Sequence, residues 1–427
     1  MNRKAISSSL LIEKTTAIIP RIFPLIFSAK SQSGGRTWAI TLFFYSLLVF
    51  AQFAFQATAQ SAAMPAPPVP APPVPAPPQL AAKSFILVDF NSGRVLAEKN
   101  INKKVEPASI TKLMTAYAVY KELSAGRLSL DEKVTISKKA WRMKGSKMFI
   151  EVGKKISVED LLKGLIIQSG NDATVALAEH IAGSESSFAD LMNQYAQQLG
   201  MYDTNFVNST GWPNKNHLTT AGDLVKLASA IIREFPEHYA WYKQKEFTYN
   251  KIKQSNRNKL LWRDKSVDGF KTGHTESAGY CLVSSAIRND MRLIAVVLGT
   301  RSEKTREDVS QSLLSYGFRF YESNKLYGGG ETLNSARIWK GAMENINLGI
   351  EEDLFVTIPR GQYKKLDATM DINSNIEAPV QKGEKMGRVS VKLDGKEIVT
   401  QTLVALQTVE EGSFWQRSKD QILQMFE

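Results

Sequence analysis

Residues 107–126 read PASITKLMTAYAVYKELSAG, a stretch that combines a helical pattern with two reactive side chains. Its apolar residues recur at helical spacing, and Gly126 stands near the predicted end of the helix. Ser109 follows Pro107 at the start, and Lys112 comes three residues later, which places both on one helical face. We therefore expect the serine hydroxyl and the lysine amine to touch.

This Ser-x-x-Lys pair suits nucleophilic catalysis only if the lysine is neutral. A serine hydroxyl needs a base, and a free lysine, with a pKa near 10.4, is protonated at neutral pH. The helix dipole, partial burial and a second cation, Lys271, would each disfavour a charged amine on Lys112. Lowering the pKa by about three requires roughly 4 kcal/mol. The alternative is a capping serine beside a solvated lysine.

A second motif, Ser169-Gly170-Asn171, lies in IIQSGNDA (166–173), between two helical patterns. A loop at this point would direct a hydroxyl and an amide into a cleft. We expect Ser169 to relay protons and Asn171 to contact a substrate amide. Serine and asparagine also cap helices, and capping is compatible with either role.

A third motif, Lys271-Thr272-Gly273, is predicted to stand just before the strand 279–287. Glycine there would let an extended substrate approach the backbone, while the cation and the hydroxyl suit a carboxylate. The backbone N–H groups of Ser109 and His274 are candidates for an oxyanion hole. Each motif alone is weak, but the ordered set of three is specific.

With its three motifs the chain resembles the low-molecular-mass penicillin-binding D-alanyl-D-alanine carboxypeptidases, which belong to the serine β-lactamase-like superfamily. The resemblance runs from about Ser84 to the C-terminus. Further stretches carry it: SGNDATVALAEHIAGS (169–184), FVNSTGWP (206–213), HLTTAGDL (217–224), SNRNKLLW (255–262), VDGFKTGHTESAGY (267–280) and SYGFRFYES (315–323).

The resemblance implies that Ser109 forms an acyl-enzyme and releases the terminal D-alanine of a peptidoglycan stem peptide, with Lys112 as general base. Penicillins should acylate the same serine. It also implies that Ser169, Asn171, Lys271 and Thr272 shape the site, without a metal or another cofactor. Arg257 and Arg306 are implied to lie near the site and to help hold the substrate carboxylate, although a surface position is the default for either arginine.

Two rival functions stay open. Class A β-lactamases carry aspartate where this chain has Gly170, which favours the carboxypeptidase branch. Their deacylating glutamate would have to come from EFTYN (246–250), whose alternating Phe247 and Tyr249 instead predict a strand. The other rival is a peptidoglycan-binding scaffold whose site is not used for catalysis.

The chain divides into five predicted segments. The apolar run 38–55 follows basic residues, so residues 1–59 are interpreted as a signal peptide, with an uncleaved membrane anchor as the alternative. The proline-rich residues 60–81 form a linker. Strands, then helices, then strands over 82–330 predict an α+β catalytic domain, an antiparallel sheet with helices packed on it and a helical subdomain. Short alternating runs in 331–410 predict a small β domain.

The last segment, residues 411–427, is predicted to form an amphipathic helix with aromatic anchors. It either lies on a membrane or packs on the β domain. Family resemblance places such a helix on the outer face of the inner membrane, which implies an exported protein on the periplasmic face of that membrane.

Composition excludes several other classes of protein. The apolar share of 43% and charged share of 22% argue against a disordered chain or a multi-span membrane protein. The net charge of +12 is partly a property of residues 1–59, which hold six Lys or Arg and one Glu, so no nucleic-acid partner is predicted. One cysteine, Cys281, and four histidines without zinc-ligand spacing predict neither a disulfide nor a metal site.

Overall fold

The computed structural model describes residues 74–425. The predicted signal peptide and most of the proline-rich linker therefore lie outside the described residues.

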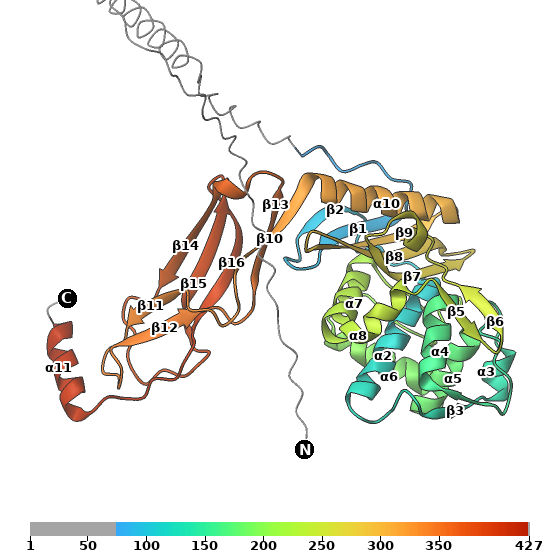
Figure 1. The fold of residues 1–427 in the computed structure, drawn as a ribbon, viewed down its shortest axis with the longest axis horizontal. Helices are drawn as coiled ribbons and strands as arrows, with labels where there is room; N and C mark the ends of the chain where they lie inside the picture. Colours follow the sequence, from blue (N-terminus) through green and yellow to red (C-terminus); the bar gives the residue numbers. More distant parts are fainter. Residues whose placement is uncertain (1–73, 426–427) are drawn as a thin grey trace, which may run out of the picture. The chain divides into compact units, whose positions relative to one another are not determined.

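The catalytic region is built on a five-stranded antiparallel sheet with the order β2-β1-β9-β8-β7 (Figure 1). Antiparallel hairpins lie at both ends of the region, and Gly93, with a φ of +70°, forms the turn of the first one. Strands far apart in sequence are adjacent here, with Ile86 paired to Val296. The sheet consists of β1 (Ser84–Asp89), β2 (Val95–Lys99), β7 (Val267–Thr275), β8 (Gly279–Arg288) and β9 (Met291–Thr300).

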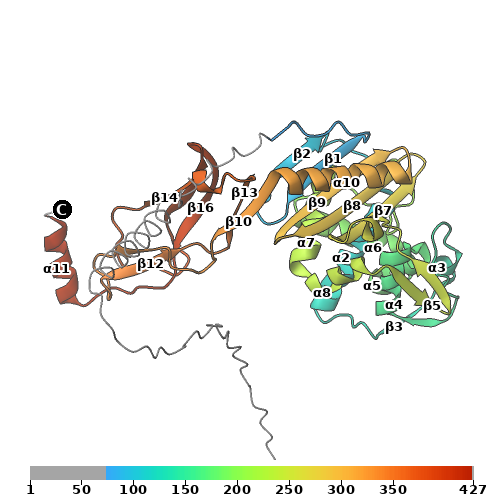
Figure 2. The ribbon, with the colours of Figure 1, turned by 45° about the horizontal axis from the view of Figure 1, so that its top comes forward.

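Helices cover both faces of this sheet, as Figures 1 and 2 show. Alternate residues of β1 point to opposite faces. Phe85 and Leu87 pack in the cluster that contains the side chains of α10 (Glu303–Phe320). Ile86 and Val88 pack in the cluster of the helical subdomain. Because both faces are buried, the strand is a continuous apolar run rather than an alternating one.

The helical subdomain lies between β2 and β7 in the sequence. The helical pattern before the second motif forms the six-residue helix α4 (Val158–Lys163), which continues as a π-helical segment, η2 (Gly164–Gln168). The residues EFTYN form a strand, as predicted. The α-helices are α2 (Lys112–Ser124), α3 (Lys138–Arg142), α4 (Val158–Lys163), α5 (Asn171–Ala182), α6 (Glu185–Gln198), α7 (Ala221–Glu234), α8 (Pro236–Tyr239) and α9 (Leu260–Arg263).

Two antiparallel sheets of two strands each and two 3-10 segments complete the catalytic region. One sheet pairs β3 (Lys133–Thr135) with β4 (Lys155–Ser157), and the other pairs β5 (Glu246–Tyr249) with β6 (Ile252–Ser255). The 3-10 segments are η1 (Ala108–Thr111) and η3 (Ala240–Lys243).

The structure corrects the expected place of the third motif. Lys271, Thr272 and Gly273 lie inside β7, where Lys271 pairs with Val283, instead of preceding a strand. Gly273 also has a close neighbour within the protein that the sequence did not predict. A Cβ on Gly273 would come 2.9 Å from the Pro107 carbonyl oxygen, so the absent side chain lets the chain before Ser109 pack on β7.

Ser109 itself lies in the 3-10 segment η1 and not in the α-helix that the periodicity predicts. Lys112 is the first residue of α2. The segment η1 brings the serine against β7, and the helix α2 carries the lysine into the subdomain core. The two elements thus hold the reactive pair at the boundary between the sheet and the helices.

The C-terminal region contains two sheets. The strand β10 (Tyr321–Tyr327) pairs with β13 (Leu354–Pro359), so ten residues before the predicted boundary at 331 already begin this region. The second sheet has the order β11-β12-β16-β15-β14. Its strands are β11 (Asn334–Arg337), β12 (Asn345–Gly349), β14 (Leu366–Ile372), β15 (Lys385–Leu393) and β16 (Lys396–Ala405), and a 3-10 turn, η4 (Tyr363–Lys365), precedes β14.

The predicted C-terminal helix is present as α11 (Phe414–Gln424), which begins with a capping box between Ser413 and Gln416. No described residue of this helix is buried, and Trp415 is 78% exposed. The contact with the β-rich region is polar, since Asp420 accepts a hydrogen bond of 2.7 Å from the backbone N–H of Lys340. Within residues 74–425, none of the helices has the length and apolar character needed to span a bilayer.

Candidate active site

Ser109 and Lys112 are in hydrogen-bonding contact, with 3.0 Å between Oγ and Nζ. The lysine is fully buried. Its Nζ atom lies 2.7 Å from Asn171 Oδ1 and 2.7 Å from the carbonyl oxygen of Thr210. The amine is thus surrounded by three oxygen atoms from three separate segments of the chain.

Burial is the main cause of the unusual proton affinity of this amine: it lowers the pKa of Lys112 to about 7. The charges of Asp172 and Glu185 act in the opposite direction. A neutral amine has two N–H donors and one lone pair, which matches three oxygen neighbours. It can donate to Asn171 and to the Thr210 carbonyl while its lone pair accepts the Ser109 O–H.

Asn171 makes contacts within the protein that the sequence did not predict. Its Oδ1 accepts from Lys112, and its Nδ2 donates to the Lys144 carbonyl at 2.7 Å. Its backbone N–H donates to the Ser146 carbonyl, also at 2.7 Å. Both ends of the carboxamide are therefore engaged by the protein, and the side chain orients the lysine and the segment 144–146.

Ser169 lies at the C-terminal end of η2 in a left-handed conformation, with a φ of +65°. This conformation is uncommon for a residue with a side chain. The Oγ atom is buried and has no hydrogen-bond partner among residues 74–425. Because Ser169 also lines the cleft beside Ser109, its hydroxyl is available to a bound molecule.

Except for Lys271, the structure brings the remaining predicted residues into this same cleft. Its walls are formed by η1, by β7 and by residues from the start of α10 and the segment before α9. The lining residues are Ser109, Ser146, Ser169, Arg257, Thr272, Gly273, His274, Tyr280, Glu303 and Arg306.

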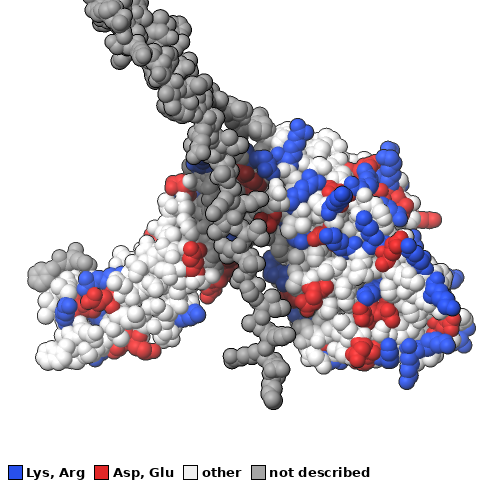
Figure 3. All heavy atoms as spheres, viewed as in Figure 1, with Lys and Arg blue, Asp and Glu red and all other residues white. Residues whose placement is uncertain are grey.

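Lys271 is buried behind the cleft, and its Nζ donates to the Thr272 carbonyl at 2.9 Å. Burial holds the pKa of Lys271 well below its ordinary value, and the charges of Lys112, Arg257 and Arg306 act in the same direction. The guanidinium groups of Arg257 and Arg306 are permanent positive charges at this end of the cleft, and Arg306 pairs with Glu303 at 3.1 Å. Figure 3 shows that Lys and Arg elsewhere are interspersed with Asp and Glu over the visible face of the catalytic region.

A second hollow extends from Ser109 toward Trp212 on the other side. Its lining residues are Ser109, Gly145, Ser146, Asn171, Thr210, Gly211, Trp212, Pro213, His274, Thr275, Glu276 and Ser277. The serine therefore lies between a cationic hollow and a hollow long enough to receive several atoms of an extended ligand.

Two contributors were missed by the sequence analysis. Asp172 accepts backbone hydrogen bonds of 2.8 Å from Met148 and 2.9 Å from Phe149, and so holds the segment that leads out of the cleft. Its place directly after the second motif is a signal that could have found it. Thr210 contributes only a carbonyl oxygen, which leaves no signature in a side-chain pattern.

Comparison with known proteins fits this geometry. The sequence model of the family described as D-alanyl-D-alanine carboxypeptidase matches residues 72–302, and that of the penicillin-binding protein 5 C-terminal domain matches residues 321–411. The chain belongs to the D-alanyl-D-alanine carboxypeptidase family.

Three relatives show how far the likeness to this family extends. The chain is 45% identical to D-alanyl-D-alanine carboxypeptidase DacC of Escherichia coli over 353 residues, 81% of this chain and 88% of the relative. Penicillin-binding protein 5 of Haemophilus influenzae superposes with a TM-score of 0.76 at 42% identity, covering 79% of this chain and all of that one. Penicillin-binding protein D2 of Listeria monocytogenes in its ampicillin-bound form has a TM-score of 0.52 at 32% identity, covering 56% and 98%.

The pKa of Lys112 predicts a pH dependence for this carboxypeptidase family member. With Lys112 as the predicted base, acylation needs its neutral amine, so the rate should fall as the pH drops through about 7 and approach a plateau above it. The measurement is the second-order rate constant for reaction with benzylpenicillin at pH values from about 5 to about 9. In Lys112→Ala the slow residual reaction should lose this limb. A wild-type rate that is flat between pH 6 and pH 8, or that rises only near pH 10, would contradict the assignment.

Proposed function

We propose that the protein is a serine D-alanyl-D-alanine carboxypeptidase in which Ser109 is the nucleophile and Lys112 the general base. The observation that carries this is the fully buried Nζ of Lys112 at 3.0 Å from Ser109 Oγ. Oγ attacks the carbonyl carbon between the last two D-alanine residues of a peptidoglycan pentapeptide stem, and the hydroxyl proton passes to Nζ. The backbone N–H groups of Ser109 and His274 face the developing oxyanion.

The tetrahedral intermediate then collapses to an ester on Ser109 as the C–N bond breaks. The leaving D-alanine needs a proton on its amine, and the Ser169 hydroxyl, which has no partner among the described residues, suits a relay from Lys112. Water attacks the ester in the second half of the reaction, and Lys112 accepts the proton of the water and passes it to Ser109 Oγ as the ester bond breaks. The stem ends one residue shorter and the enzyme is regenerated.

The terminal carboxylate of the substrate would lie in the cationic hollow. Arg257 and Arg306 line it together with Thr272, which supplies a hydroxyl donor. Binding of an anion there would also raise the proton affinity of Lys271. Such a pocket favours a substrate that ends in a free carboxylate, as a carboxypeptidase requires.

Penicillins would react with Ser109 because a strained lactam amide takes the place of the peptide bond. The ampicillin-bound form of the Listeria relative supports this for a protein with the same fold. A β-lactamase is the second candidate. Its deacylating glutamate would have to come from EFTYN, but the first four residues of this stretch form strand β5 and not a helical turn. No observation favours a non-catalytic scaffold over the hydrolase.

Export and membrane attachment complete the proposal. Residues 1–59 would direct export and 60–81 would serve as a linker, with the catalytic domain extending to about residue 320 and the β domain following it. Helix α11 would lie on the periplasmic face of the inner membrane, with Phe414, Trp415 and Met425 entering the lipid surface. Their exposed fractions of 68%, 78% and 75% support this.

Replacing the nucleophile tests the catalytic proposal. Ser109→Ala should abolish release of D-alanine from a pentapeptide and also the mass increase of one penicillin seen in the intact wild-type protein. Persistent adduct on the wild type for many minutes would match a carboxypeptidase, whereas rapid turnover of penicillin would favour the β-lactamase. If Ser109→Ala released D-alanine at the wild-type rate, the proposal would be wrong.

The membrane proposal is tested with vesicles. In protein beginning at residue 60, the double variant Phe414→Ser, Trp415→Ser should bind phosphatidylglycerol-containing vesicles about tenfold or more weakly, because two exposed aromatic side chains no longer enter lipid. Tyr202→Ser is the matched control, since Tyr202 is 74% exposed but lies in the catalytic region. Equal sedimentation of all three proteins with vesicles would count against the helix as an anchor.

A further inference from the structure

The turn formed by residues 208–212 supplies one of the three oxygen neighbours of the general base. The carbonyl oxygen of Thr210 accepts a hydrogen bond of 2.7 Å from Lys112 Nζ. A backbone carbonyl has no rotamer of its own, so its position depends entirely on what holds the chain around it. The contacts that fix this turn therefore help to set the direction of the lone pair on Lys112 Nζ.

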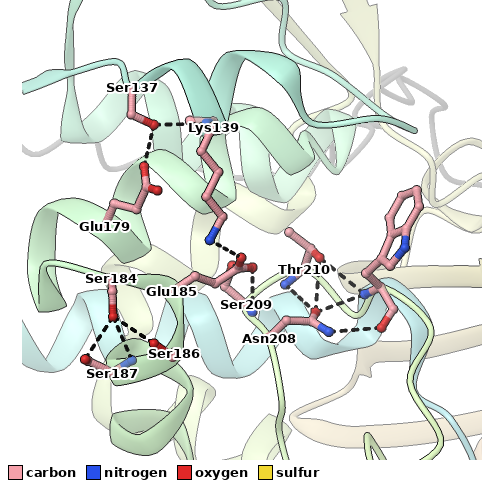
Figure 4. A network of polar contacts seen from close by, with 12 residues as sticks. Ser137, Lys139, Glu179, Ser184, Glu185, Ser186, Ser187, Asn208, Ser209 and Thr210 are labelled. Carbon is pink, nitrogen blue, oxygen red and sulfur yellow. Dashed lines mark hydrogen bonds and ion pairs between the residues drawn. The ribbon is translucent and has the colours of Figure 1, made fainter.

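The side chain of Asn208 closes the turn from within. Its Oδ1 accepts from the backbone N–H groups of Thr210 at 3.2 Å, Gly211 at 2.8 Å and Trp212 at 3.0 Å. The hydroxyl of Thr210 donates to the same oxygen at 3.1 Å, and Nδ2 donates to the Trp212 carbonyl at 3.0 Å. Figure 4 shows these contacts converging on Asn208. With the N–H groups directed inward, the Thr210 carbonyl is left free to meet Lys112.

Contacts with neighbouring helices fix where the closed turn lies. Ser209 donates from its backbone N–H and its hydroxyl to Glu185 Oε1 at 3.3 and 2.8 Å (Figure 4), and Glu185 also pairs with Lys139 at 2.8 Å. The Ser209 carbonyl accepts from Thr115 Oγ1 at 2.6 Å. Thr115 lies on α2, one helical turn beyond Lys112. The same helix therefore positions both the lysine and the turn formed by residues 208–212.

The back of the turn packs on the chain that carries the nucleophile. Gly211 has a φ of +80°, and a Cβ there would come 1.8 Å from the Ala108 carbonyl oxygen. A larger residue would displace either the turn or the segment before Ser109. The position of the Thr210 carbonyl is thus coupled to both members of the reactive pair.

We propose that Asn208 is a positioning residue for the general base, a role that rests on the proposed function. Its carboxamide holds the Thr210 carbonyl where one Lys112 N–H is donated to it, so that the lone pair faces the Ser109 hydroxyl. Without Asn208 the Thr210 carbonyl is no longer held in place, and Asn171 is then the one fixed acceptor for the Lys112 amine. The lone pair on Nζ is therefore no longer fixed in direction. The loss falls on proton transfer and not on substrate binding.

The experiment is transient kinetics of penicillin acylation with Asn208→Ala. The acylation rate constant should fall by about tenfold to a hundredfold, the effect of a misplaced reacting group, while the dissociation constant of the non-covalent complex stays within about twofold. Asn205→Ala is the matched control, because Asn205 lies in the same loop and bonds only the Asn216 carbonyl through its side chain, at 2.7 Å. It should react like the wild type. An unchanged rate constant in Asn208→Ala, or a loss that lies wholly in binding, would overturn the proposal.

A second background separates positioning from general damage. If Asn208 acts through the lysine, Asn208→Ala should cause no further loss of acylation when Lys112 is already alanine. The same proportional loss in both backgrounds would mean that the turn acts independently of the base. Penicillin adduct on wild-type protein that disappears in Ser109→Ala keeps the proposed function standing even if this inference fails.

Asn208→Asp keeps the proposal testable if the alanine variant does not fold. The aspartate retains an acceptor oxygen for the three N–H groups but loses the donor to the Trp212 carbonyl. It adds a negative charge to the turn whose Thr210 carbonyl contacts Lys112, which should raise the pKa of the amine. The acid limb of acylation should move to higher pH, with most of the wild-type rate recovered above about pH 8. An acid limb at the wild-type pH would show that the turn is not coupled to the base, and would overturn the proposal.

Discussion

The desolvation of a single ammonium group is the constraint on which the rest of the site depends. Taking the pKa of Lys112 from its ordinary value of 10.5 to about 7 corresponds to roughly 5 kcal/mol against the charged form. Asp172 and Glu185 oppose the shift, so burial must outweigh both carboxylates. A solvated lysine at this position would be protonated at neutral pH and could not accept the proton of Ser109.

The fold achieves this burial by bringing together segments that are distant in sequence. The lysine begins α2, while its acceptors come from the residue that begins α5 and from the turn after α6. Ser109 lies against β7, where the absence of a side chain on Gly273 lets Pro107 approach the strand. The sheet consequently supplies one side of the cleft, and the helical subdomain supplies the buried environment of Lys112.

Much of this arrangement could be predicted from local pattern. The Ser109–Lys112 contact follows from their spacing, and the hairpins at 84–99 and 279–300 follow from turn residues between apolar runs. Burial of Lys112 was expected to be partial, and the structure makes it complete. The strand β7 was missed because glycine and lysine interrupt its apolar pattern, and the true neighbour of Gly273 is the protein's own backbone. Contacts made by backbone atoms, such as the Thr210 carbonyl, are invisible to side-chain motifs, as is a residue like Asn208 that acts on that backbone.

The most direct test of the account is the protonation of Lys112 itself. Protein labelled with 13C at the lysine Cε can be titrated by NMR, and the Lys112 resonance identified by its loss in Lys112→Arg. We expect this resonance to titrate with a midpoint near pH 7, far below the exposed lysines. A Lys112 resonance that keeps the chemical shift of a protonated amine until about pH 10 would contradict the account, because the base would then be charged where it must act.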